Sequence, residues 1–374
     1  MKILHLLAVG GTGGIEVLCQ NIINKSKEDN RICVLFEKGE IYEKLIRANK
    51  NVFSTTDLDR NFSKIVKYIS DYCNKEQIDI IVMHHGGLAC NIIYIMLQKK
   101  LKNIKFVRYI HGCFDKYTFG NDGNFIKRLF VKILMQKALN ISDLIIYISN
   151  AAKSTFENNF KIKSKSILIY NGIPEKFFTN ISERKYDKKL NITFVGRLAR
   201  VKGVDLLIDA FYELTKKYNN ITMTITGDGE ERKALEEKVK ILGLSDIIEF
   251  TGKKNDVIPI LDNSNIFVYP SIWEEGFGIS VLEAMARGCI PVSFNKGGLP
   301  EVIDNNENGK IVNETDSEAL LEALEEILNL SEEKKKKMSY NATKKAEKFK
   351  LENTISELER VLNEVNNCKY DMKL

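Results

Sequence analysis

The sequence lacks any long apolar run: no stretch approaches the ~18 consecutive apolar residues of a membrane-spanning helix. Its seven cysteines form no Cys-x-x-Cys pair. A disulfide framework and a zinc site are therefore not expected, and a reducing cytosol is the natural compartment. The apolar run at residues 3–9 is too short for a signal peptide, and glycines follow it at once. We expect a cytoplasmic protein, soluble or peripheral at the inner face of the membrane.

A strong excess of charge of one sign is also absent. The chain has 56 Lys and Arg against 50 Asp and Glu, which gives a net charge of +6. This mild excess suggests an anionic ligand or an anionic membrane surface, and no nucleic-acid partner is expected. A chain of 374 residues is too long for one ordinary core, and its 44% hydrophobic content suffices for two.

Short apolar runs alternate with helical patterns in two similar halves. The runs at residues 3–9, 31–36, 78–83, 104–110 and 144–148 predict parallel strands in the first half, and the pattern restarts at residues 192–195. This alternation predicts an α/β fold with two doubly wound, Rossmann-like domains facing a central cleft. The predicted boundaries are an N-terminal domain at 1–172, a polar linker at 173–189 and a C-terminal domain at 190–350, with a helix at about 351–374 able to pack back on the first domain.

The most informative stretch is residues 269–286, which reads as a strand end, a loop and a helix. Its loop carries Gly276 and Gly278, and a glycine-rich turn that enters a helix can hold an anion on its backbone N–H groups. Glu275 and Glu283 bracket the turn and suit hydrogen bonds from hydroxyl groups. A ligand with hydroxyls on both sides of a phosphate is a nucleotide sugar.

Two cations stand in the loop after the first strand of the second half. Arg197 can bind two phosphate oxygens at once, and Lys202 supplies a point charge from the same turn. Solvated surface cations are the alternative. Taken with the turn at residues 276–278, the pair predicts a diphosphate site.

Several motifs resemble those of retaining GT-B glycosyltransferases of family 4. They occur in the family's order and spacing: Gly196-Arg197, Lys202-Gly203, Gly227-Asp228-Gly229, Pro270-Ser271, Glu275-Gly276-Phe277-Gly278, Glu283-Ala284-Met285-Ala286 and Gly297-Gly298-Leu299-Pro300-Glu301. In the first half, Gly13-Gly14-Ile15-Glu16 and Tyr170-Asn171-Gly172-Ile173 are similar more loosely. The resemblance covers about residues 1–350.

The resemblance implies a donor-binding C-terminal domain and an acceptor-binding N-terminal domain. Arg197 and Lys202 would bind the diphosphate and stabilise the leaving group, Glu283 would bind the ribose, and Glu275 would hold the transferred sugar without acting as a nucleophile. The implied donor-binding residues are Gly13, Gly14, Arg197, Lys202, Gly252, Lys253, Lys254, Glu275, Gly276, Phe277, Gly278, Ile279 and Glu283, of which Gly252, Lys253 and Lys254 lie near the nucleobase. The implied catalytic residues are Glu275, Arg197, Lys202 and His111.

The four histidines divide by position. His111 ends a strand and resembles the family's active-site histidine, which contacts the sugar near the reacting carbon; a histidine bonded to backbone is the alternative. His84 and His85 could border the acceptor, and His5 reads as a core residue. Asp57-Leu58-Asp59 spells the motif of metal-dependent transferases, but GT-B enzymes need no bridging metal, so no metal or other cofactor is expected.

The implied activity is hexosyl transfer with retention, from a nucleotide-diphosphate sugar to a glycan or lipid-linked acceptor. UDP is the commonest nucleotide in the family, and the expected acceptor is a lipid-linked intermediate of a surface or capsular polysaccharide. The basic segment 99–137 contains a predicted helix at 125–139, which suits an anionic membrane surface. On that helix we expect one buried apolar face, formed by Phe125, Ile126, Leu129, Phe130, Ile133 and Leu134. The face predicted to meet the membrane is the other one, which mixes Lys127, Arg128 and Lys132 with Val131, Met135 and Leu139; a solvated helix face over the core is the alternative.

Two other functions remain open. An NAD-dependent oxidoreductase would use the glycine loop at residues 10–14 and Glu37, but Glu16 stands where the third glycine of its fingerprint belongs. A non-catalytic sugar-nucleotide-binding protein of the same fold would not need both glutamates and both cations. Binding of UDP rather than NAD(H), and donor hydrolysis or transfer, would separate the three.

Overall fold

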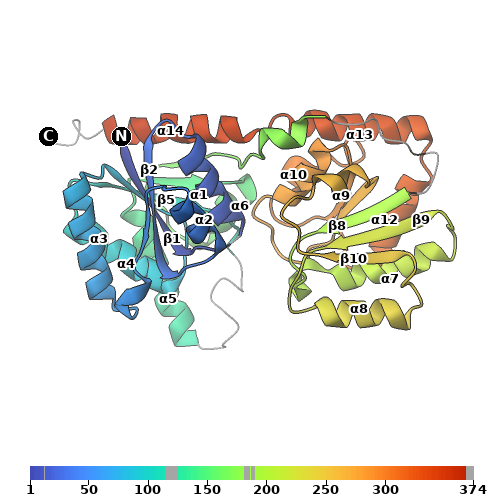
Figure 1. Cartoon of the computed structure of the whole chain (residues 1–374), viewed down its shortest axis with the longest axis horizontal. Coiled ribbons are helices and arrows are strands. Elements are labelled where there is room, and N and C mark those ends of the chain that lie inside the picture. Colours follow the sequence, from blue (N-terminus) through green and yellow to red (C-terminus); the bar gives the residue numbers. More distant parts are fainter. Residues whose placement is uncertain (12, 115–124, 181–185, 187–189, 368–374) are drawn as a thin grey trace. The chain divides into compact units, whose positions relative to one another are not determined.

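The computed structural model describes the chain except residues 12, 115–124, 181–185, 187–189 and 368–374, and the side chains of 125–127. The chain forms two compact units. Unit 1 comprises Met1–Tyr170 and Glu352–Leu374, and unit 2 comprises Asn171–Leu351. Each unit is a parallel sheet with helices packed around it (Figure 1).

Unit 1 is built on a seven-stranded parallel sheet of order β3-β2-β1-β4-β5-β6-β7. The strands are β1 (Lys2–Val9), β2 (Asp29–Glu37), β3 (Val52–Ser54), β4 (Ile80–Met83), β5 (Lys105–Ile110), β6 (Leu144–Tyr147) and β7 (Ser166–Leu168). The helices are α1 (Gly14–Lys25), α2 (Glu40–Arg47), η1 (Thr56–Leu58), α3 (Phe62–Glu76), α4 (Leu88–Lys100), α5 (Phe125–Asn140), α6 (Asn150–Asn159) and α14 (Leu351–Asn367). The strand order reverses between β1 and β4, which is where such sheets bind ligands.

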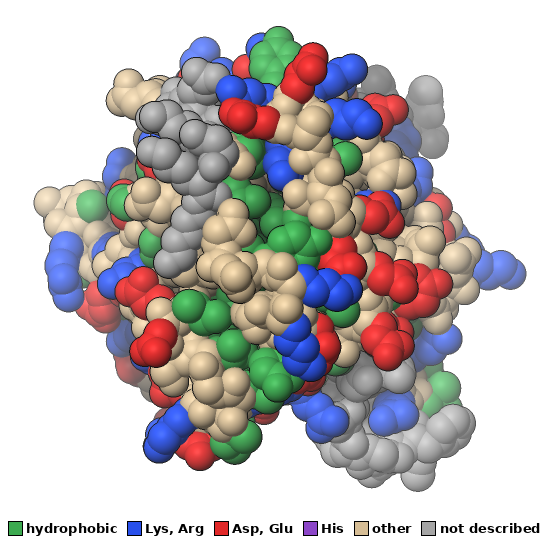
Figure 2. Space-filling model, turned by 90° about the vertical axis from the view of Figure 1, so that its right-hand side faces the viewer, with side chains coloured by type: hydrophobic (Ala, Val, Ile, Leu, Met, Phe, Trp, Pro, Cys, Tyr) green, Lys and Arg blue, Asp and Glu red, His purple; other side chains and the backbone are tan. Residues whose placement is uncertain are grey.

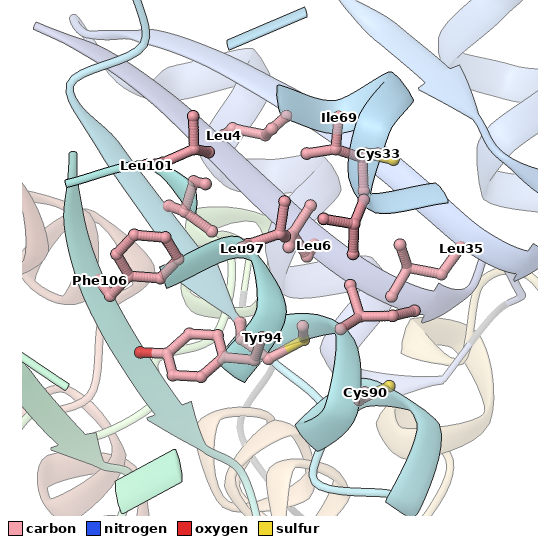
Figure 3. Packing of buried hydrophobic residues seen from close by; sticks show 14 of the residues in the cluster. Leu4, Leu6, Cys33, Leu35, Ile69, Cys90, Tyr94, Leu97, Leu101 and Phe106 are labelled. Atoms are coloured by element: carbon pink, nitrogen blue, oxygen red, sulfur yellow. The ribbon is translucent and has the colours of Figure 1, made fainter. Parts of the chain in front are cut away.

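The main core of unit 1 lies between the sheet and helices α3 and α4. Long aliphatic side chains from β1, β2, α3 and α4 interdigitate there, and the ring of Tyr94 meets that of Phe106 edge to face at 5.4 Å. Figure 3 labels ten members: Leu4, Leu6, Cys33, Leu35, Ile69, Cys90, Tyr94, Leu97, Leu101 and Phe106. This dense packing fixes the strand ends that carry the polar residues of the unit.

Unit 2 is built on a six-stranded parallel sheet of order β10-β9-β8-β11-β12-β13. The strands are β8 (Leu190–Val195), β9 (Ile221–Thr226), β10 (Ile248–Gly252), β11 (Ile266–Tyr269), β12 (Ile290–Phe294) and β13 (Lys310–Val312). The helices are η2 (Glu175–Phe178), η3 (Arg200–Lys202), α7 (Val204–Thr215), α8 (Arg232–Ile241), α9 (Ile258–Asp262), α10 (Ile279–Ala286), α11 (Leu299–Val302), α12 (Ser317–Leu328) and α13 (Glu332–Ala346). The order reverses between β8 and β11. The predicted α/β class with two doubly wound, parallel sheets is confirmed.

The polar segment predicted as a separate linker, 173–189, is part of unit 2 where it is described. Arg287, which is 2% exposed, binds the carbonyls of Thr179 at 2.6 Å and Asn180 at 3.1 Å, and its Nε donates to Asp262 at 2.7 Å. A buried guanidinium needs such acceptors. Composition alone indicated a linker, because the residue that binds the carbonyl groups of this segment, Arg287, is far away in sequence, at the end of helix α10.

The C-terminal helix α14 packs on unit 1. The Nζ of Lys25 lies 2.6 Å from Glu352 Oε1, and the Ser26 hydroxyl donates to Glu359 at 2.6 Å. The Thr354 hydroxyl donates to the Tyr170 carbonyl at 2.9 Å. These contacts extend over two turns of the helix. No helix among the described residues is long and apolar enough to cross a membrane.

Helix α5 buries a different face from the one predicted. Val131, Met135 and Leu139 are 6%, 2% and 0% exposed, whereas the expected core residues Leu129, Phe130 and Ile133 are 49%, 50% and 56% exposed. Of the other expected core residues, Leu134 is half-buried against the core, and the side chains of Phe125 and Ile126 lie outside the described part of the chain. Apolar residues occur on both sides of this helix, so periodicity alone does not choose the buried side. Arg108, counted in the basic segment, is buried and donates to Asn91 at 2.6 Å.

Candidate functional site

The loops that follow β8, β9, β11 and β12 lie together at the carboxyl edge of the sheet of unit 2. Leu198 N–H donates to the Asp228 carbonyl at 2.9 Å, and Ile272 N–H donates to the Val201 carbonyl at 2.9 Å. Gly298 N–H donates to the Glu275 carbonyl at 2.8 Å. The predicted motifs are therefore brought together by backbone hydrogen bonds between loops that are far apart in sequence.

Two glycines allow this close approach. Gly203 has φ +64°, and a Cβ added there would lie 2.1 Å from the Pro270 carbonyl oxygen. Gly297 has φ +54°, and its Cβ would lie 2.0 Å from the Glu275 carbonyl oxygen. Any side chain at either position would push the loops apart and move Glu275.

Lys202 and Glu275 form an ion pair in the middle of these loops. The Nζ of Lys202 lies 2.5 Å from Glu275 Oε1 and 2.8 Å from the Tyr269 hydroxyl. The Ser271 hydroxyl also donates to Glu275 Oε1. The side chains of Lys202 and Glu275 are 16% and 12% exposed. The cation and the carboxylate therefore orient each other.

The electrostatics of this group keep its charges fixed. Burial disfavours the cation, but Tyr269 and Glu275 outweigh burial and raise the pKa of Lys202. Burial, followed by the Glu275 carboxylate, raises the pKa of Tyr269. Lys202 therefore stays charged and Tyr269 stays protonated at neutral pH.

Helix α10 begins beside this pair. Its N-cap is Gly278 at φ +89°, where a Cβ would lie 2.5 Å from a Leu299 methyl carbon, and no side chain caps the helix. Phe277 is 2% exposed and packs edge to face on Phe349 with ring centroids 5.3 Å apart. The predicted residues Gly276, Phe277, Gly278 and Ile279 thus form one rigid turn into an uncapped helix start, which suits an anion.

Arg197 differs from Lys202 in its surroundings. It is exposed, and no hydrogen bond or ion pair involves its side chain within the described part of the chain. Gly252 ends β10 at φ +71°, and its carbonyl accepts from Gly227 N–H at 3.0 Å. Lys253 and Lys254 follow and are exposed. All four predicted residues lie at the carboxyl edge.

Glu283 lies in the second turn of α10 and is half-buried. Burial raises its pKa to about 7, with a smaller lowering by Lys176 and a smaller raising by Asp256. It is the titratable carboxyl group at this edge whose charge changes near neutral pH. The two predicted glutamates therefore differ, because Glu275 forms a close ion pair with Lys202, whereas at Glu283 the effect of burial exceeds that of Lys176.

In unit 1 the Glu16 carboxylate lies close to Gly13 in the glycine loop after β1. A Cβ on Gly13 would lie 2.5 Å from Glu16 Oε2, whereas a Cβ on Gly14 would meet nothing within 4 Å. Glu16 is 4% exposed, and its Oε1 lies 3.5 Å from His85 Nε2. The contact of Gly13 and Gly14 with phosphate stays a prediction, and the negative Glu16 leaves Gly14 as the more open of the two.

The other three histidines form a hydrogen-bonded row. His5 Nδ1 lies 2.8 Å from His84 Nε2, and His84 Nδ1 lies 2.9 Å from His111 Nε2. His111 therefore bonds a side chain, not backbone. His84 is 3% exposed and cannot border an acceptor directly, and the prediction that His5 lies in the core is confirmed, since it is 1% exposed.

One group among the described residues has the composition of a metal site. His5, Cys19 and His84 have ligand atoms within 4.8 Å of one another, but both histidines use those nitrogens in their mutual hydrogen bond. Asp57 of the Asp57-Leu58-Asp59 motif is 85% exposed and pairs with Lys38 at 3.6 Å. A cavity of about 650 Å³ in unit 2 is lined by residues that include Asn191, Thr222 and Ile248, and none of the predicted site residues lines it.

Sequence reasoning missed the residues that hold the predicted ones. Tyr269 and Ser271 contact Lys202 and Glu275, and Glu274 Oε2 accepts from Gly297 N–H at 2.7 Å. Ser271 belongs to the Pro270-Ser271 motif but was given no role, and the one signal for Tyr269 and Glu274 was proximity to motif residues in sequence. In Figure 2, the described side chains of one face mix Lys and Arg with Asp and Glu, so positive charge is not gathered into one stripe there.

Two family models match consecutive parts of the chain. The model described as Glycosyltransferase Family 4 matches residues 12–177. The model described as Glycosyl transferases group 1 matches residues 176–345, which include every predicted residue of unit 2.

Individual relatives agree. An uncharacterized glycosyltransferase of Haemophilus influenzae is 26% identical over 366 residues, which cover 96% of this chain and 98% of that protein. The capsular polysaccharide biosynthesis glycosyltransferase CapM of Staphylococcus aureus is 31% identical over 258 residues, which cover 63% of this chain and 66% of that protein. The structure of Anabaena Alr3699/HepE in complex with UDP has a TM-score of 0.82 at 19% identity and covers 97% of this chain and 100% of that one. Other structures of that protein contain UDP with glucose, or UDP-glucose.

Proposed function

This chain belongs to the GT-B glycosyltransferases of family 4, and we propose that it moves a hexose, with retention, from a UDP-sugar to a lipid-linked acceptor. The acceptor would be an intermediate of a surface or capsular polysaccharide. The observation that carries the donor part is the Lys202–Glu275 pair beside the uncapped start of α10. One side of the pair suits phosphate and the other suits sugar hydroxyls.

The choice of donor and acceptor has support from the relatives. UDP and UDP-glucose are the ligands named for the Anabaena protein, and capsular polysaccharide biosynthesis is named for the Staphylococcus aureus protein. Nothing at the unit 2 edge requires a metal, because Lys202, Arg197 and the helix start supply positive charge for the diphosphate. An oxidoreductase would leave that charge without a purpose.

The first test compares two exposed arginines of one loop. Arg197→Ala is expected to weaken UDP binding by about tenfold to a hundredfold, the loss of one or two charge-assisted hydrogen bonds. Arg200→Ala should leave binding unchanged, because Arg200 is three residues away and outside the predicted phosphate site. Calorimetry with UDP measures both variants.

The donor is identified with the same protein. Thermal shift and slow donor hydrolysis should select UDP-sugars from a panel of UDP-, GDP- and ADP-sugars, without stabilisation by NAD(H). The anomer of the transfer product, read by NMR, should match that of the donor. Equal effects of the two arginine variants would contradict the phosphate assignment, and an inverted product would contradict retention.

Nucleotide affinity should depend on pH through Glu283. Ribose hydroxyls bind the ionised carboxylate best, so affinity should fall as pH drops through the Glu283 pKa of about 7. Between pH 8 and pH 6 the loss for the wild type is expected to be about tenfold. Glu283→Gln should be weaker at pH 8 and flatter with pH. Titration of the nucleotide phosphate is common to both proteins and cancels in their ratio, so parallel pH profiles would remove Glu283 from the ribose site.

We further propose that helix α5 docks on an anionic membrane. Leu129, Phe130 and Ile133 are exposed on it, and the half-buried Arg128 and the exposed Lys132 are next to them in sequence. Apolar insertion and attraction to anionic headgroups act together on such a surface. The exposed face is therefore better suited to a membrane than the face predicted from sequence.

Vesicle sedimentation tests the docking surface. Binding to vesicles rich in phosphatidylglycerol should weaken with salt and be lost in the Phe130→Ser/Ile133→Ser variant and in the Arg128→Glu/Lys132→Glu variant. The matched control is Ile241→Ser/Tyr340→Ser, which removes residues that are 75% and 61% exposed in unit 2. Wild-type protein that stays in the supernatant at low salt would end this proposal.

A further inference from the structure

The row of three histidines in unit 1 ends at a residue that sets its proton positions. Beyond the contacts His5–His84 and His84–His111, His5 Nε2 lies 2.8 Å from Asn30 Oδ1. His5, His84 and Asn30 are 1%, 3% and 5% exposed, so solvent does not compete for the hydrogen bonds between these three residues. The residues come from the middle of β1, the ends of β4 and β5, and the start of β2.

The amide of Asn30 has one possible orientation. Its Nδ2 donates to the Glu28 carbonyl at 3.0 Å, and a carbonyl can only accept a hydrogen bond. The Asn30 Oδ1 must therefore face His5, and the nitrogen of His5 that meets it, Nε2, must carry the proton.

This choice passes along the row. A neutral imidazole has one N–H and one bare nitrogen. With Nε2 of His5 protonated, Nδ1 of His5 accepts, so His84 Nε2 must donate to it. His84 Nδ1 then accepts from His111 Nε2, which leaves Nδ1 of His111 with a lone pair. No described residue donates to that nitrogen.

The surroundings keep all three rings neutral. Burial lowers the pKa of His5 to about 4, that of His111 to about 3, and that of His84 well below its ordinary value. The groups that face the row are the Cys19 thiol, the Tyr109 ring and His85, and none of them is an anion at neutral pH. The Glu16 carboxylate is directed at His85 instead.

We infer that Asn30, His5 and His84 lock His111 in its Nε2–H tautomer, so that His111 Nδ1 acts only as a hydrogen-bond acceptor for a substrate hydroxyl. The inference rests on the proposed glycosyltransferase function for the identity of that substrate. His111 would touch the sugar, and the other three are positioning residues. A sugar with fluorine or a methyl ether in place of the bonded hydroxyl would offer no proton and be rejected.

A metal bound by the same atoms would reverse the row. Zinc between His5 and His84 would remove the proton from His84 Nε2 and move the two nitrogens from 2.8 Å to roughly 3.3 Å, as Zn–N bonds near 2.0 Å in a tetrahedral site require. His84 would then donate from Nδ1 to His111. The tautomer of His111 therefore distinguishes the two arrangements.

The experiment is NMR of the full chain labelled with ¹⁵N-histidine, which contains only four histidines. The expected result is that His5, His84 and His111 all show the Nε2–H tautomer from pH 5.5 to pH 8 and do not titrate. Asn30→Leu should give His111 mixed tautomers and lower transfer kcat/KM about tenfold, the effect of one misplaced hydrogen bond, with UDP affinity retained. Its melting temperature should fall, because the buried His5 Nε2–H loses its acceptor. Asn30→Asp, which keeps an acceptor for His5, should restore the tautomer.

The inference would be overturned by an Nδ1–H tautomer at His111 in the wild type, by titration of His111 near its ordinary pKa, or by one equivalent of zinc bound with loss of the His84 Nε2–H signal. An unchanged His111 spectrum in Asn30→Leu would also do so. The tautomer is read without substrate, so absence of any transfer by the wild type would remove the proposed function and leave this test intact.

Discussion

Glu275→Gln is expected to lower sugar transfer by about 10²–10³-fold, while UDP affinity changes little. The amide oxygen of glutamine can still accept from Lys202 and Ser271, so the loop should keep its shape. What is lost is the negative charge that holds the sugar hydroxyls and balances Lys202. The measurement is kcat/KM for transfer beside calorimetry with UDP.

A matched control variant and a test of the alternative role of Glu275, that of a nucleophile, are both available. Glu237→Gln makes the same chemical change on the exposed face of α8 and should leave both quantities unchanged. Loss of transfer and UDP binding together in Glu275→Gln would refute a role confined to the sugar. Azide that restores turnover of Glu275→Ala and forms a glycosyl azide would identify Glu275 as a nucleophile, against the positioning role proposed for it.

Lys202→Met is expected to lower transfer by about 10³-fold and to destabilise unit 2. Methionine replaces most of the aliphatic stem, but the Glu275 carboxylate and the Tyr269 hydroxyl lose their partner. The loss of stability should stay below the ~3–5 kcal/mol of a fully buried pair, because the two side chains are 16% and 12% exposed. Urea unfolding and transfer kinetics measure the two effects.

A double-mutant cycle separates the interaction between Lys202 and Glu275 from the contribution that each residue makes to stability by itself. Lys202→Met/Glu275→Gln should be more stable than Lys202→Met alone, since the unpaired carboxylate has been removed as well. Lys216→Met is the matched control, because Lys216 pairs with Glu213 on the surface and its loss should not measurably change stability. Additive effects on stability in the cycle would show that the 2.5 Å contact carries no coupling.

Most of the fold and the donor-side motifs could be predicted from the chain. Buried parallel strands can be recognised as short apolar runs in the sequence. The turns at Gly203, Gly278 and Gly297 require glycine, because the backbone there has positive φ or touches another loop. Arg197, Lys202, Glu275 and Glu283 all follow predicted strands of the second half, which was enough to predict that they lie at one edge of one sheet. The roles of these residues stay predictions until the variants above are measured.

Other features depended on which surfaces meet in three dimensions. Helix α5 has apolar residues on both sides, so only packing decides that Met135 is buried and Phe130 exposed. Segment 173–180 has the composition of a linker, and Arg287 makes it part of unit 2.

Local periodicity and backbone geometry are enough to predict the two doubly wound sheets, the glycine turns and the charged residues at the strand ends. Which charges pair and where protons reside depends on contacts that form only in the folded chain. Lys202 meets Glu275 across 73 positions, and Asn30 sets the tautomer of His111 through two other rings. Hydrogen bonds of this kind join residues that share no sequence pattern, so their direction is fixed by what each partner can donate or accept once folding has brought them together.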